Sequence, residues 1–201
     1  MRSLAAAFAT LAFVSPPAPG PKGLEGVPVP QVAVLAQPRA LHLDQTVDGI
    51  KCELAEKVAF HIHAHLAVFV NGKQKQVPYG IGIGPPLRGQ NSAVGPFVTS
   101  GSCFAWMHTH AGDGIIHMEA PKQITFNLGE FFDIWGQKLS STQVGPAHGK
   151  VTALVDGKVV KGNPRSIVLK EHELIQLDVG TLVGEQKVGF AQLLSAPAGA
   201  H

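Results

Sequence analysis

Histidines spaced two residues apart are the part of this sequence that could do chemistry. Residues 61–65 read HIHAH and residues 108–117 read HTHAGDGIIH, so six of the ten histidines lie in two short motifs. Imidazole binds zinc, copper, nickel and iron, and two imidazoles on one face of a strand can reach the same ion. The spacing therefore predicts a metal site built from both motifs. The candidate ligands are His61, His63, His65, His108, His110, His117 and Glu119.

The first motif does not suffice for one ion. Alternate side chains of a strand share a face, so His61, His63 and His65 form a row. The first and third stand about 13 Å apart along a straight strand, which is too far for one ion. One of the three is therefore a ligand to a second ion or a residue that orients a ligand. The missing donors have to come from the second motif.

The second motif has the pattern of a tight hairpin, because two apolar stretches flank Ala-Gly-Asp-Gly. A four-residue loop over 111–114 places His108 opposite His117. It also places His110 opposite Ile115. Three imidazoles then lie on one patch of the sheet.

Copper or zinc is the expected ion, because an all-nitrogen site favours copper over zinc in the Irving–Williams order and imidazole suits both. Met107 and Met118 lie beside the histidines, and thioethers favour Cu(I). Strand alternation turns both away from the histidine face, so we expect them in the core. Glu119 shares the face of His117 and is a further ligand, a general base, or a partner that orients an imidazole.

A mainly β fold has to position these motifs. Residues 58–70 have the pattern of one long strand before an Asn-Gly turn, and residues 151–160 that of a hairpin around Asp-Gly. Residues 166–180 predict a last long strand pair. LGEFFDIWGQ predicts a short helix that ends at Gly136, with Trp135 packed in the core. We expect an antiparallel β-sandwich or barrel with one short helix.

The first 36 residues predict a signal peptide followed by a Pro/Ala-rich linker. The apolar run Leu4–Val14 is too short to span a bilayer but suits an export signal. The alternative is a disordered tail on a cytosolic protein. We expect a single metal-binding domain over 41–190, a disordered tail over 191–201, no transmembrane domain, and export to the periplasm, the cell surface or the medium.

Two cysteines, Cys52 and Cys103, complete the chemistry-bearing residues. In an exported protein they predict one disulfide. The alternative is that Cys103, five residues before His108, is a thiolate metal ligand. We favour the disulfide because of the export signal.

Charge and the remaining polar residues exclude several classes of protein. The formal net charge is +2 and charged residues make up 15% of the chain, so no basic field indicates a nucleic-acid partner. Ser100 and Ser102 lack the base and acid of a nucleophilic triad. The isolated histidines, to which we assign no role, are His42, His148, His172 and His201.

Three segments, HIHAHLAVFVNG, CFAWMHTHAGDGIIHMEAP and ITFNLGEFFDIWGQKLS, carry a family resemblance. Over roughly residues 48–180 the chain resembles a group of exported prokaryotic proteins that share HxHxHL, HTHxxxGxIHxE and FxLGxFFxxWG. The group brings no established activity to transfer.

This chain is similar only in part to two families of copper proteins and to the cupins. Residues 106–114 are similar to the HxH segment of multicopper oxidases, and His-Thr-His also to copper monooxygenases with β-sandwich domains. However, the chain has no His-Cys-His, and residues 66–72 lack the glutamate that a cupin would have. Only the principle of imidazole pairs on a β-scaffold carries over.

The favoured function is an exported protein that holds copper or zinc for storage, delivery or detoxification. The alternative is a metal-dependent hydrolase or oxidoreductase that uses the same histidines, with Glu119 as general base. A second alternative is an interaction domain in which the histidines act as a pH switch.

Overall fold

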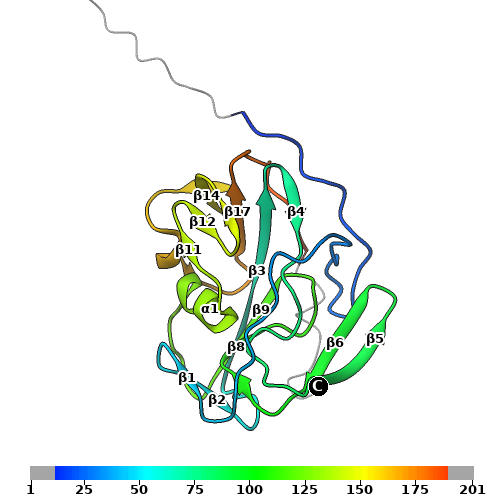
Figure 1. The fold of residues 1–201 in the computed structure, drawn as a ribbon, viewed down its shortest axis with the longest axis vertical. Coiled ribbons are helices and arrows are strands. Elements are labelled where there is room, and N and C mark those ends of the chain that lie inside the picture. The colour runs from blue at the N-terminus through cyan, green and yellow to red at the C-terminus, as the bar shows by residue number, and fades with distance from the viewer. Residues whose placement is uncertain (1–11, 190–201) are drawn as a thin grey trace, which may run out of the picture.

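The centre of the fold is a seven-stranded sheet built around strand β3 (Figure 1). The computed structural model describes residues 12–189. The sheet runs β15 (Lys158–Val160), β14 (Val151–Val155), β17 (Leu174–Val179), β3 (Phe60–Val70), β9 (Ile115–Ala120) and β8 (Met107–His108), and β4 (Lys73–Lys75) also pairs with β3. The 11-residue β3 confirms the predicted long strand and carries the first histidine motif.

Four smaller sheets accompany the central sheet in the described part of the chain. They consist of β1 (Thr46–Val47), β2 (Ile50–Glu53) and β7 (Phe104–Ala105); β5 (Arg88–Ser92) and β6 (Gly95–Ser100); β10 (Phe126–Asn127) and β16 (Val168–Leu169); and β11 (Leu139–Ser140), β12 (Gln143–Val144) and β13 (Ala147–His148). A short 3-10 helix, η1 (Pro164–Ser166), precedes β16. The prediction of a mainly β fold with one short α-helix is confirmed, and none of these sheets closes into a barrel.

One strand pair departs from the predicted antiparallel arrangement. β17 runs parallel to β3, with Leu174 opposite His65 and Val179 opposite Val70. The predicted strand pair over 166–180 is also not formed, because β16 pairs with β10 while β17 lies between β14 and β3. These partners come from distant parts of the sequence, which a local pattern does not reveal.

Both predicted two-residue hairpin turns are present. Asn71 and Gly72, between β3 and β4, have φ of 50° and 78°. Asp156 and Gly157, between β14 and β15, have φ of 48° and 73°. Two consecutive positive φ angles match the twist of a tight hairpin, and Asn-Gly and Asp-Gly adopt them at low cost.

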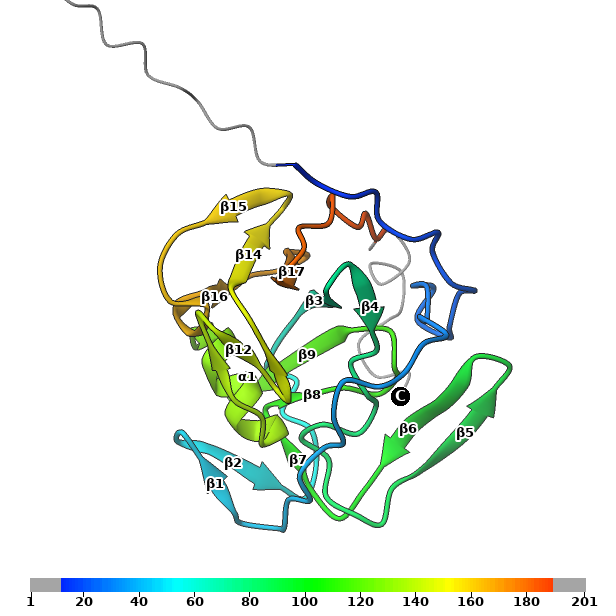
Figure 2. The same cartoon turned by 45° about the horizontal axis from the view of Figure 1, so that its top comes forward.

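The helix α1 (Leu128–Trp135) packs against the apolar face of the central sheet (Figure 2). Asn127 and Glu130 form a capping box at its start, and Gly136 ends it with φ of 79°. Trp135 is fully buried, as predicted, and its indole N–H donates to the Ala36 carbonyl at 3.2 Å.

Strand alternation separates the core from the histidines. The core residues of the central strands include Ala64, Leu66, Val68, Met107, Ile116 and Met118. Both methionines are fully buried there, which confirms their predicted core position. The residues between them in sequence, such as His63 and His117, point to the opposite face because strand side chains alternate.

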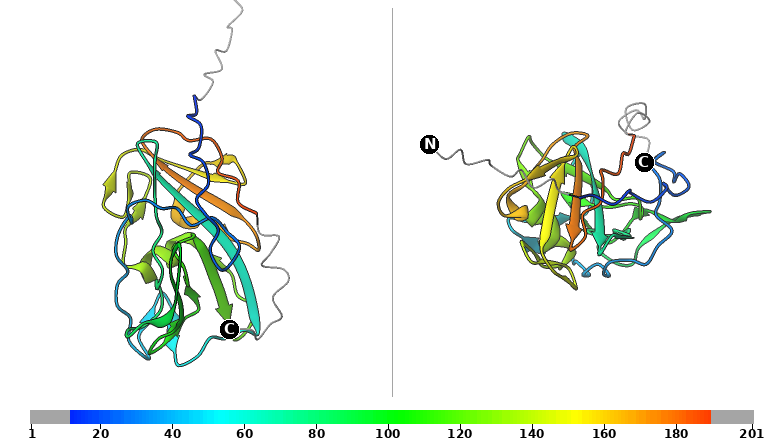
Figure 3. Two further views of the ribbon diagram at one scale, coloured as in Figure 1. Left: turned by 90° about the vertical axis from the view of Figure 1, so that its right-hand side faces the viewer. Right: turned by 90° about the horizontal axis from the view of Figure 1, so that it is seen from above.

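Residues 12–30 run along the side of the molecule away from α1, and residues 36–39 then reach the C-terminal end of α1, where the Arg39 N–H donates to the Trp135 carbonyl at 3.0 Å (Figures 1 and 3). Val27, Val29 and Leu35 are buried, and Leu35 N–H donates to the Gln76 carbonyl at 2.9 Å. The packed region therefore begins before Leu41, inside the segment predicted to be signal peptide and linker. The predicted tail over 191–201 lies outside the described residues. Within residues 12–189, no helix has the length and apolar character needed to cross a membrane.

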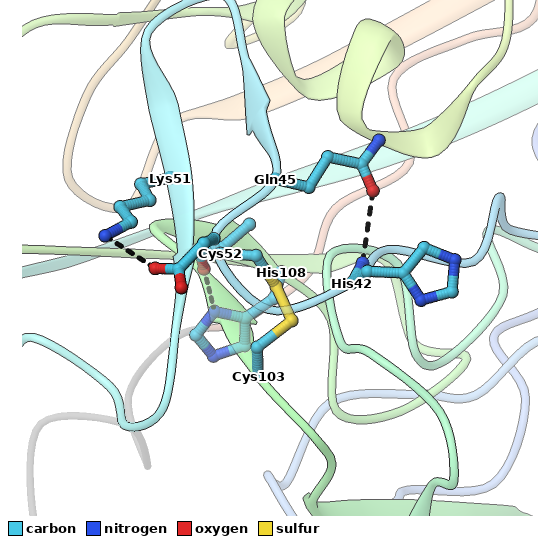
Figure 4. The surroundings of a disulfide bond; sticks show 8 residues. His42, Gln45, Lys51, Cys52, Cys103 and His108 are labelled. Carbon is cyan, nitrogen blue, oxygen red and sulfur yellow. Dashed lines mark hydrogen bonds and ion pairs between the residues drawn. A yellow bond between two sulfur atoms is a disulfide. The ribbon is translucent and has the colours of Figure 1, made fainter.

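Cys52 and Cys103 form the predicted disulfide (Figure 4). It links β2 to the residue before β7, and both cysteines are fully buried. His108 lies beside the bond in Figure 4, so the disulfide fixes the segment that leads into the second histidine motif. The alternative of a thiolate ligand at Cys103 is excluded by the bond.

Removing the disulfide is expected to destabilise the fold. A bond at a sequence separation of 51 stabilises a protein by about 4 kcal/mol in the chain-entropy model. For a variant with Cys52→Ser and Cys103→Ser we expect the free energy of unfolding in urea to fall by about 2–4 kcal/mol. Wild-type protein unfolded under reducing conditions is the control and should match the variant. An unchanged midpoint would contradict a stabilising role.

Candidate metal centre

Cross-strand register gathers the histidines into a row. His63 on β3 lies opposite His117 on β9, and His117 lies opposite His108 on β8. Residues directly opposite in neighbouring strands share a face, so three imidazoles line up across three strands. The predicted pairing of His108 with His117 is confirmed. In the adjacent row His61 lies opposite Glu119. Ile115 pairs with His65 on β3 instead of the predicted His110.

His108 and His110 point their Nε2 atoms at each other. The two Nε2 atoms are 3.1 Å apart. His108 Nδ1–H donates to the Ala105 carbonyl at 3.0 Å, and His110 Nδ1–H donates to the Val98 carbonyl at 2.5 Å. A carbonyl only accepts hydrogen bonds, so each neutral ring carries its proton on Nδ1 and a lone pair on Nε2.

Both rings are held neutral. Burial lowers the pKa of His108 to about 4, although Glu119 acts in the opposite direction. Burial, reinforced by His117 and His108, lowers the pKa of His110 well below its usual value. Two lone pairs facing each other at 3.1 Å repel unless a cation lies between them. Donors of a tetrahedral zinc site are roughly 3.3 Å apart, given Zn–N bonds of about 2.0–2.1 Å.

His117 lies between two carboxylates. Its Nε2–H donates to Glu25 Oε1 at 2.7 Å, and its Nδ1 is 3.7 Å from Glu119 Oε1. Burial disfavours the charged ring, but Glu25 and Glu119 outweigh it and raise the pKa of His117 to about 10. Burial acts to raise the pKa of Glu119, but the adjacent imidazoles of His117 and His61 hold it well below its usual range. Nδ1 is buried without a hydrogen-bond partner among the described residues.

Four donors form a group that can hold a metal ion, and we call it the inner set. It consists of His108, His110, His117 and Glu119, with donor atoms within 4.8 Å of one another. Each of the four side chains belongs to a residue that is at most 4% exposed. Imidazole and carboxylate are both zinc and copper(II) ligands, and backbone carbonyls on the far ring nitrogens are the usual partners that orient such ligands.

His61 and His63 lie at the edge of the inner set, and we call this pair the outer pair. Their Nε2 atoms are 3.0 Å apart, and His61 Nε2 is 3.1 Å from Glu119 Oε1. Burial, followed by repulsion from His117 and His61, lowers the pKa of His63 to about 2. The His61 side chain is 25% exposed, so this edge of the site reaches solvent.

His65 does not join either group. It is buried, and its Nε2–H donates to the Asp113 carbonyl at 2.9 Å. It thereby holds the loop that follows His110. The next residue, Gly114, has φ of 86°, and a Cβ there would lie 2.4 Å from the Leu66 carbonyl oxygen. Six of the seven predicted ligands come together, and the seventh shapes the loop between them.

Two carboxylates approach the site without belonging to either motif. Glu25 bonds His117, and Glu56 Oε1 lies 3.6 Å from His108 Nε2 and 3.5 Å from His110 Nε2. Burial and repulsion from Glu119 raise the pKa of Glu56 to about 7. Glu25 is the single acidic residue of a Gly/Pro-rich segment. Glu56 lies four residues before Phe60, where β3 begins. Neither has a sequence signal that links it to the histidines.

Among residues 12–189, the isolated histidines supply no donor to the inner set or the outer pair. His42 and His148 are exposed. His172 lies next to the outer pair, where its backbone N–H donates to the His63 carbonyl at 2.6 Å, and its Nε2 lies 3.1 Å from Glu171 Oε1. His201 lies outside the described residues. The absence of a role for these residues remains a prediction.

The chain matches no protein-family model, no curated protein and no solved structure with which it was compared. The case for a metal centre therefore rests on its geometry.

The stability contributed by His65 is expected to depend on pH. Burial, partly opposed by the Asp113 carbonyl, lowers the pKa of His65 to about 4. The unfolded chain takes up the proton near pH 6.5 and the folded chain only near pH 4, so acidification between these values favours unfolding. His65→Gln keeps a donor but does not titrate. The measurement is urea unfolding of chelator-treated protein. Between pH 7 and pH 4 we expect the free energy of unfolding of the wild type to fall by up to about 3 kcal/mol more than that of this variant. A difference that stays constant with pH would contradict this account.

Proposed function

We propose that this protein binds one transition-metal ion, zinc or copper(II), through the inner set. The carrying observation is the pair of Nε2 atoms of His108 and His110, 3.1 Å apart, each on a ring whose Nδ1 donates to a backbone carbonyl. This arrangement orients two lone pairs toward one point. A divalent cation is the simplest group that satisfies both, and Glu119 supplies a negative charge beside it.

The donor atoms favour zinc or copper(II) over copper(I). Copper(I) prefers thiolate and thioether ligands. Cys52 and Cys103 are bonded to each other, and Met107 and Met118 are fully buried in the core. Nitrogen and carboxylate oxygen remain, and this combination suits the two divalent ions.

Binding is better supported than catalysis. The inner donors are almost fully buried, whereas a catalytic ion needs a position that substrate can reach. A general base at neutral pH needs a pKa near 7, and the pKa of Glu119 is held well below the usual carboxyl range. A pH-switch role is also less supported, because His108 and His110 stay neutral through the mildly acidic range.

Storage, delivery or detoxification of the ion outside the cytoplasm is the role that we propose. The disulfide is consistent with an oxidising compartment. The apolar run near the N-terminus and the resemblance to exported prokaryotic proteins also favour export. A closed His/Glu site holds its ion by burial and therefore suits a protein that keeps or carries metal.

Metal analysis of untagged protein tests the proposal. After chelator treatment and exposure to Zn²⁺ or Cu²⁺, gel-filtered wild type should retain metal by elemental analysis. The variant with His108→Gln and His110→Gln should lose at least 90% of it, because both oriented lone pairs are gone. His42→Gln with His148→Gln removes two exposed histidines and should bind as the wild type does. Wild type without metal, or a folded inner-set variant with undiminished metal, would refute the proposal.

Glu25 is expected to tune the affinity of the inner set. Its carboxylate accepts the Nε2–H of His117 and orients the ring so that Nδ1 faces Glu119, and Nδ1 becomes a donor to an ion once it gives up its proton. Partners of this kind typically change metal affinity about 10–100-fold. We expect Glu25→Gln to weaken Zn²⁺ binding about 10-fold or more in a competition titration, while Glu171→Gln, at an exposed site, should leave it unchanged. Equal affinities for the two variants would show that Glu25 has no orienting role.

A further inference from the structure

The inner set leaves two converging imidazoles unused. A tetrahedral ion takes four donors, and the inner set already supplies four. His61 and His63 remain, with their Nε2 atoms 3.0 Å apart on the same face of the sheet. We propose that the outer pair and Glu119 hold a second metal ion, so that the site is binuclear with Glu119 as the bridging carboxylate. This inference rests on the proposed function of the inner set.

The distances around the outer pair are those of donors that share an ion. His61 Nε2 is 3.0 Å from His63 Nε2 and 3.1 Å from Glu119 Oε1. Both separations are close to the roughly 3.3 Å between donors of a tetrahedral zinc ion. His61, His63 and His117 also offer nitrogen atoms within 4.8 Å of one another, as a second group able to hold a metal.

Glu119 is placed to bridge the two ions. Its Oε1 lies 3.1 Å from His61 Nε2, 4.0 Å from His108 Nε2 and 3.7 Å from His117 Nδ1, so the carboxylate lies between the outer pair and the inner set. Its Oε2 is buried without a hydrogen-bond partner among the described residues. A buried carboxylate oxygen without a donor carries a large desolvation cost, which a cation removes. Carboxylates have two oxygens and commonly span the two ions of a binuclear site.

The two ions are expected to exchange at different rates. The His61 side chain is 25% exposed, whereas His108 is fully buried. The outer ion therefore has a direct route to solvent, and the inner ion does not. We therefore expect the inner ion to be retained while the outer ion exchanges with ions in the medium.

An equilibrium titration of chelator-treated, untagged wild type with Zn²⁺ alone tests the inference, with free zinc followed by a chromophoric indicator. We expect saturation at about two ions per chain. Saturation at about one ion would overturn the second site and leave the proposed function intact. No binding would refute both, so the two failures are distinguishable.

The variant with His61→Gln and His63→Gln assigns the second ion. We expect it to saturate at about one ion, while the control with His42→Gln and His148→Gln still takes up about two. A folded outer-pair variant that binds two ions, or none, would overturn the assignment. Circular dichroism checks the fold of each variant. If the outer-pair variant does not fold, single variants at His61 and His63 replace it, and the wild-type stoichiometry still decides the proposal.

Discussion

The structure depends on how buried imidazoles and carboxylates are compensated on one face of the central sheet. Water is largely excluded from the row formed by His63, His117 and His108, so each lone pair and each charge needs a partner from the protein or from an ion. The carbonyls of Ala105 and Val98 take the Nδ1 protons of two rings. What remains is a group of nitrogen and oxygen donors pointing at one another, which is costly for a fold that does not bind a cation.

Much of the surrounding architecture serves this face. The opposite face of the same strands packs on α1 and the apolar core, which fixes the sheet and therefore the register of the histidines. The disulfide anchors the segment before β8, and the His65 bond to the Asp113 carbonyl fixes the loop between the two halves of the second motif. Ligands held by neighbours in this way lose little entropy when an ion binds, so the site is preorganised.

The charge arrangement explains why a binding role fits better than catalysis. Glu25 and Glu119 flank His117, so their two negative charges balance a positive charge on or beside this ring. Glu119 Oε1 lies 3.1 Å from His61 Nε2 and 4.0 Å from His108 Nε2, so its charge acts on both the outer pair and the inner set. Such a group of donors could hold a metal ion, while its burial limits the approach of a substrate. Exposure rises toward His61, His63 and Glu56, so this is the side of the cluster that reaches solvent.

Local patterns in the sequence, namely the alternation of apolar and polar residues and the residues that favour turns and helix caps, predict several features correctly. They predict the long strand over the first motif, the Asn-Gly and Asp-Gly turns, the short capped helix, the core positions of Met107 and Met118, and the pairing of His108 with His117. Tertiary structure decided the rest. Glu25 reaches His117 across 92 residues, β17 joins β3 in parallel, and His65 bonds a loop instead of an ion. These contacts depend on how distant segments pack, and a lone acid or a third histidine in a row has no local pattern that reveals its partner.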